Sequence, residues 1–146
     1  MINCALKPQY IVPNPMRAKE GMSKDNRPSK RCLDNTGRKE RCVFDFDAPK
    51  PNMHPSLVAY LSDYCGFLPE AVIHSGNKSL HAWWNCKDWS TQDIQTFEEE
   101  AARVGADPAL LGDSGRCQFV RMPGGYRDNG KRQIIHFWNP NPQNHE

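Results

Sequence analysis

The chain has 146 residues, which is the length of one globular domain with a buried core. No apolar run approaches membrane-spanning length, and the first residues lack the pattern of a secretory signal, so we expect no membrane partner. The net charge is +2, but residues 1–41 carry ten Lys and Arg against four Asp and Glu. This basic leading segment favours a polyanionic partner, although a solvated arm has the same composition.

Cysteine spacing gives little sign of a metal or disulfide framework. The six cysteines contain no Cys-x-x-Cys pair. An even number permits disulfides, but without a secretory signal the pattern favours reduced, structural thiols.

Residues 1–40 form a basic segment in which proline is frequent and hydrophobic periodicity is weak. This composition predicts a loop-rich N-terminal segment with one short strand at residues 10–12. Its cationic side chains, Arg27 among them, are candidates for nucleic-acid contact, and simple disorder explains the composition equally well.

The next elements follow a strand, helix, hairpin order. A strand is predicted at residues 41–47, ended by Pro49 and Pro51, and a helix follows over 54–66 with Gly66 as its stop. Residues 71–75 and 79–86 predict two strands of a hairpin.

The last third predicts one more helix and two more strands. Ser90 and Asp93 suit a capping box for a helix running to about residue 104. Strands are predicted at 116–121 and 131–138, followed by a polar tail at 139–146. Together the elements predict an α+β fold, with a mostly antiparallel sheet, two main helices on one face and the other face free for a ligand.

Two acidic residues end the first strand. Asp45 and Asp47 are two residues apart, so their side chains project to the same face of an extended strand. Carboxylates this close repel each other unless a cation lies between them or one is protonated. Oxygen ligands of this kind suit Mg²⁺ or Mn²⁺.

Phosphate-binding chemistry is predicted at the turn between the hairpin strands. The turn carries Lys78, and Ser79 and His81 share one face of the next strand, so both side chains can donate to one phosphate. Arg121 ends a strand at a Pro-Gly-Gly break and Lys131 begins the next, and fixed cations at strand ends suit phosphates. Each fragment alone is also explained as an ordinary turn or surface charge.

The order of these motifs resembles one family. Asp45-Phe46-Asp47, Ser79-Leu80-His81, an acidic residue after the next helix and Arg121-Met122-Pro123-Gly124 are similar to the catalytic core of the archaeo-eukaryotic primase (primase-polymerase) superfamily, in its small phage and plasmid versions. The similarity spans residues 41–138. Asp107 is the best candidate for the third acid, and Asp113 is the alternative.

The resemblance implies an RRM-like primase-polymerase palm that adds nucleotides on a single-stranded DNA template. It implies Asp45, Asp47 and Asp107 as catalytic ligands of Mg²⁺ or Mn²⁺ in a two-metal mechanism. Nucleoside triphosphates would be substrates and a replicative helicase a partner, in the cytoplasm of a bacterium or a phage-infected host cell. The contacts expected for the incoming nucleotide are from Ser79, His81, Lys78, Arg121 and Lys131, and those for nucleic acid from Arg116, Arg127 and Arg27.

Two other functions stay open on the sequence. A non-catalytic module would bind nucleotides or single-stranded nucleic acid on the basic, aromatic-bearing sheet face. A phosphatase of the haloacid-dehalogenase type also begins with Asp-x-Asp after an apolar strand, but Ala48-Pro49 replaces the usual Thr or Val there.

Overall fold

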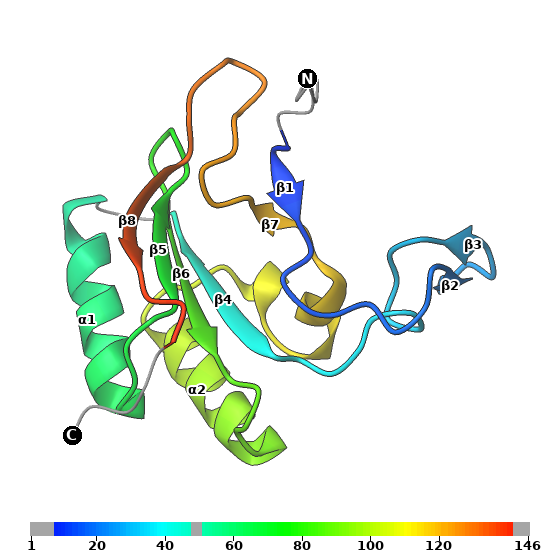
Figure 1. Ribbon diagram of the computed structural model, residues 1–146. Helices are drawn as coiled ribbons and strands as arrows, with labels where there is room; N and C mark the ends of the chain where they lie inside the picture. The colour runs from blue at the N-terminus through cyan, green and yellow to red at the C-terminus, as the bar shows by residue number, and fades with distance from the viewer. Residues whose placement is uncertain (1–7, 48–50, 142–146) are drawn as a thin grey trace.

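The computed structural model describes residues 8–47 and 51–141. The predicted strand-ending Pro49, the end of the predicted tail and Cys4 lie outside this part of the chain. Four strands form an antiparallel sheet in the order β4-β6-β5-β8 (Figure 1). The strands are β4 (Arg41–Phe46), β5 (Ala71–His74), β6 (Leu80–Asn85) and β8 (Ile134–Trp138). The predicted 71–75/79–86 hairpin is confirmed, except that Ser79 precedes β6.

Two helices cover one face of this sheet, as predicted (Figure 1). They are α1 (His54–Cys65), which follows the short 3₁₀ helix η1 (Pro51–Met53), and α2 (Thr91–Arg103). The predicted capping box of α2 is present, since Ser90 Oγ accepts the Asp93 N–H at 3.1 Å. Gly66 ends α1 with a positive φ of 76°.

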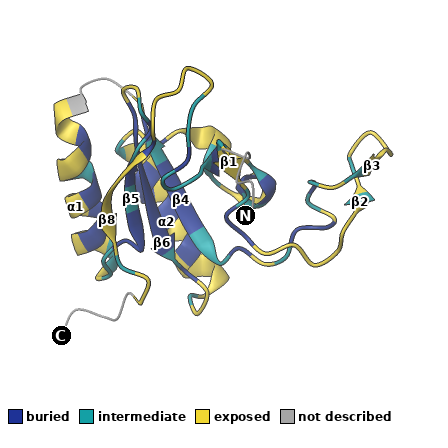
Figure 2. Ribbon diagram, turned by 45° about the horizontal axis from the view of Figure 1, so that its top comes forward, coloured by how far each residue is buried: buried dark blue, intermediate teal, exposed yellow. Residues whose placement is uncertain are grey.

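The main hydrophobic core lies between the helices and the sheet. Phe44 and Trp84 are fully buried, and Phe97 of α2 packs against both rings. Figure 2 shows the buried sides of α1 and α2 turned toward the strands. Mixed helices and an antiparallel sheet confirm the α+β prediction, whereas the predicted domain boundaries stay a prediction.

The second face of the sheet is partly covered, so the prediction of a free face is wrong. There β1 (Tyr10–Ile11) pairs with β7 (Val120–Arg121), and this ribbon lies on the side opposite the helices (Figure 1). Val120 joins a second buried cluster with sheet residues that include Ile73 and Trp83. The cause is that Val120 of β7 packs on sheet residues far away in the sequence, together with the partly buried Leu110, and local periodicity does not reveal such contacts.

The last two predicted strands are shorter than expected. Only Val120–Arg121 of residues 116–121 forms a strand, because Asp113–Cys117 forms a 3₁₀ helix, η3. A second 3₁₀ helix, η2 (Pro108–Leu110), precedes it, and Gly115 packs so closely on η2 that a Cβ would lie 2.0 Å from the Leu110 oxygen. Strand β8 begins at Ile134 rather than 131, since the Gln133 N–H donates to the Gly125 oxygen at 2.8 Å.

The N-terminal segment contains more structure than the predicted short strand. Strands β2 (Gly21–Met22) and β3 (Pro28–Ser29) form a small, mostly exposed hairpin (Figure 2). Asn14 is buried, and its Oδ1 accepts N–H bonds from Glu40 and Arg41 at 2.8 and 3.0 Å. These bonds connect the segment to the start of β4.

Candidate active site

The candidate site is built around a contact between neighbouring strands. Asp45 on β4 lies directly opposite His81 on β6, and Asp45 Oδ2 is 3.3 Å from His81 Nε2. Ser79 Oγ is also 3.3 Å from this nitrogen. The His81 side chain is almost completely buried, and that of Asp45 is 21% exposed. Three predicted site residues therefore meet at the end of the sheet where β4 ends and β6 begins.

Burial makes the Asp45 carboxylate costly to ionise. Its pKa rises to about 6, chiefly because burial disfavours the charge, and the nearby charges of Asp47 and Asp107 add to the rise. A hydrogen bond from Ser79 opposes it. Asp45 Oδ1 is buried and has no hydrogen-bond partner among the described residues. The site therefore contains an oxygen that lacks a compensating donor or cation.

His81 has the opposite shift. Burial lowers its pKa to about 4, and the positive charges of Arg121 and Arg127 contribute in the same direction. The imidazole is therefore neutral near pH 7, with one N–H to donate. Its Nδ1 is buried and has no hydrogen-bond partner in the part of the chain that the structure describes.

The other carboxylate of the pair is exposed. Lys78 Nζ lies 3.3 Å from Asp47 Oδ1, with both side chains more than half exposed. This exposed ion pair contributes little stability, so both groups are available to a ligand at small cost. The turn thus brings a predicted phosphate-binding cation to the predicted metal ligands.

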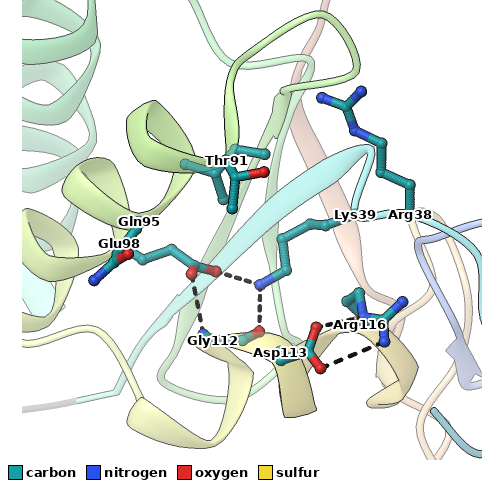
Figure 3. Close-up of a pocket in the computed structure, with 9 residues that line it drawn as sticks. Arg38, Lys39, Thr91, Gln95, Glu98, Gly112, Asp113 and Arg116 are labelled. Carbon is teal, nitrogen blue, oxygen red and sulfur yellow. Dashed lines mark hydrogen bonds and ion pairs between the residues drawn. The ribbon is translucent and has the colours of Figure 1, made fainter.

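Asp107, and not Asp113, lies beside Asp45. The backbone N–H of Asp107 donates to the backbone carbonyl oxygen of Asp45 at 2.9 Å, and the Asp107 carboxylate contributes to the raised pKa of Asp45. Its side chain caps η2 by accepting the Ala109 N–H at 2.9 Å. Asp113 instead pairs with Arg116 Nε at 2.8 Å, in a separate pocket (Figure 3).

The acidic residues have the chemistry that a divalent cation requires, but their side chains are not arranged as a complete set of ligands. Three carboxylates interact through their charges, and one of their oxygens is buried and unpaired. Within residues 8–47 and 51–141, no three His, Cys, Asp or Glu side chains are already arranged to hold a metal ion. Binding by Asp45, Asp47 and Asp107 would therefore need side-chain rearrangement, which for Asp107 includes release of the η2 cap.

Two arginines border the site. Arg121 donates to Gln9 Oε1 at 2.6 Å and lies over the Tyr10 ring, 4.5 Å from its centroid. Arg127 donates to the Ser75 oxygen at 3.2 Å. The sequence analysis missed Gln9 and Tyr10 as positioning residues, because no local pattern links residues 112 positions apart.

The remaining predicted cations lie elsewhere or make no contact with the acids. Lys131 is exposed, and its backbone oxygen accepts the Arg127 N–H at 2.8 Å. Arg27 is exposed in the turn between β2 and β3, and this hairpin lies away from the four-stranded sheet (Figure 1). Arg116 donates to the Gly37 oxygen at 2.8 Å and lines the pocket of Figure 3, where it connects segments of the fold.

Comparison with known protein families, curated proteins and solved structures found no match for this chain. In the described part of the chain, no helix has the length and apolar character to cross a membrane.

Proposed function

We propose that the chain is a primase-polymerase-type nucleotidyltransferase that adds nucleotides on a single-stranded DNA template. The observation that carries the proposal is the meeting of Asp45, Ser79 and His81, which come from two separate motifs, at one end of the sheet. A role in phage or plasmid DNA replication, a helicase partner and a cytoplasmic location follow from the same resemblance and stay predictions.

Each group has a role in this proposal. Asp45, Asp47 and Asp107 would hold Mg²⁺ or Mn²⁺, which supplies charge neutralisation to the reacting phosphates. Ser79 and the neutral His81 donate to the incoming triphosphate. The positive charges of Arg121, Arg127 and Lys78 then balance a polyphosphate that would otherwise be repelled by the acids.

Incorporation of labelled nucleotides on single-stranded templates, with and without a primer, tests this function. The wild-type chain is expected to extend DNA in a template-dependent way, only when Mg²⁺ or Mn²⁺ is present. Incorporation that persists in a chelator, or that ignores the template sequence, would contradict the proposal.

The variants Asp107→Asn and Asp113→Asn form a matched pair that tests which aspartate is the third acid. We expect Asp107→Asn to reduce incorporation by about 10²-fold or more, because it removes a charge beside Asp45. Asp113→Asn should change incorporation less than about threefold, since its carboxylate pairs with Arg116 instead. Steady-state kinetics at saturating Mn²⁺ measure both, and equal losses would show that Asp107 has no special role.

A non-catalytic binding module is the second candidate. The observation that favours it is a groove of about 490 Å³ on the second face of the sheet, lined by Trp83, Met122 and Trp138. Trp83 Nε1 is buried and no described residue is its hydrogen-bond partner, and aromatic side chains stack on unpaired bases. Metal-independent binding of single-stranded DNA, with no incorporation on any template, would favour this function over the first.

A further inference from the structure

A separate cavity of about 400 Å³ lies between the start of α1 and the strands β5 and β8. It is on the helix side of the sheet, whereas Asp45 and His81 belong to the opposite face. Among the described residues, four nitrogen-bearing side chains line it, those of His54, His74, Lys78 and His136, and none of these lining residues is a carboxylate. Its chemistry therefore suits an anion.

The polar groups lie at different depths. His54 is only 2% exposed, and its Nε2 is buried with no hydrogen-bond partner within residues 8–47 and 51–141. The Lys78 side chain is 61% exposed, and His136 is exposed as well. Val58 and Phe137 contribute apolar lining. A ligand that satisfies this arrangement has an anionic end at the mouth, an apolar body and a polar atom at the buried end.

The histidines offer donors rather than a metal site. The Gly76 N–H donates to His74 Nδ1 at 3.2 Å, so Nδ1 is an acceptor and Nε2 is the donor of this ring. The His136 ring stands edge-on to it, with 6.1 Å between centroids. No metal-holding group of three His, Cys, Asp or Glu is formed by these or the other described residues.

We propose that this cavity binds a nucleoside monophosphate. The phosphate contacts Lys78 and His136 at the mouth, the base packs on the apolar lining, and a heteroatom of the base hydrogen-bonds to His54 Nε2. A fatty acid has no polar atom for His54, and inorganic phosphate leaves the apolar lining empty. Because Lys78 also pairs with Asp47, an occupied cavity draws this cation away from the acids of the candidate active site.

Calorimetric titration of the full chain with AMP, in a chelator, tests the proposal. AMP is expected to bind with one-to-one stoichiometry. His54→Phe, which keeps the ring shape, and His136→Ala, at an exposed position, should each weaken binding by about tenfold or more. Ile134→Ala is the matched control on β8, because Ile134 is exposed and is not among the described residues that line this cavity, and it should leave the AMP affinity unchanged.

Several results would overturn the proposal. They are absence of AMP binding, inorganic phosphate or adenosine binding as tightly as AMP, and wild-type affinity in folded His136→Ala. If His54→Phe fails to fold, His136→Ala alone decides. The test is independent of the proposed polymerase activity, since Asp45→Asn should abolish incorporation and keep the AMP affinity. Loss of AMP binding in Asp45→Asn would place the AMP site on the opposite face of the sheet and would therefore overturn the proposal for this cavity.

Discussion

Asp45→Asn is expected to reduce metal-dependent nucleotide incorporation by about 10³-fold or more. The substitution removes the negative charge at the centre of the candidate site, where Asp45 contacts His81 and lies within the influence of Asp47 and Asp107. An amide of the same shape keeps the packing of β4 but is a weak ligand for Mg²⁺ or Mn²⁺. Single-turnover incorporation of labelled nucleotides measures the loss.

The same substitution is expected to stabilise the metal-free protein near neutral pH. Folding raises the pKa of Asp45 from 3.8 to about 6, so the folded state holds this proton more tightly than the unfolded chain. The cost of ionisation is absent below pH 3.8, grows between pH 3.8 and 6, and is complete above pH 6. Asp45→Asn should therefore gain about 2–3 kcal/mol at pH 7 to 8, and much less at pH 4.

Urea denaturation at several pH values separates this effect from general changes in packing. Asp63→Asn is the matched control, because Asp63 is exposed on α1, and it should change the free energy of unfolding by less than about 0.5 kcal/mol. Mn²⁺ should stabilise the wild type more than Asp45→Asn, since a cation favours the ionised carboxylate. An Asp45→Asn protein with full activity would rule out the proposed mechanism. A gain in the free energy of unfolding that does not vary with pH would show that ionisation of Asp45 is not its cause.

Local sequence patterns predicted the elements whose structure depends on residues close together in the sequence. The alternation in residues 79–86 puts His81 and Trp83 on one face and Trp84 on the other, and the structure has this arrangement. Ser90 and Asp93 locate the start of α2 because the capping box uses only neighbours. The proximity of Asp45 and His81 follows from the antiparallel pairing of β4 with β6.

What the sequence could not predict depends on contacts between distant segments. Nothing near Tyr10 indicates that it pairs with Arg121 and helps to cover the second face of the sheet. The position of Asp107 beside Asp45 likewise depends on a backbone bond between distant segments, whereas Asp113 makes a local pair with Arg116 three residues later. Likewise, His54 and His136 meet in one cavity although 82 residues separate them, so no spacing rule could have grouped them.

Glu98→Gln is expected to cost about 3–5 kcal/mol of folding stability, because it leaves a buried ammonium without its counterion. Glu98 forms an ion pair with Lys39, and each side chain is only 9% exposed (Figure 3). Lys39 Nζ also donates to the Gly112 oxygen at 2.7 Å, and the Gly112 N–H donates to Glu98 Oε2 at 3.0 Å. The network therefore connects α2, the residues before β4 and the turn between η2 and η3.

A double variant distinguishes the buried charge from ordinary loss of contacts. Lys39→Met combined with Glu98→Leu removes both charges, so it should recover most of the stability that Glu98→Gln loses. Glu99→Gln is the matched control, since Glu99 is exposed and accepts a bond from the neighbouring Gln95 at 2.9 Å. Urea denaturation measures all three, and a Glu98→Gln protein as stable as Glu99→Gln would show that the pair contributes nothing. Because Gly112 lies in the segment that follows Asp107, loosening this network should also lower incorporation, by less than Asp107→Asn does.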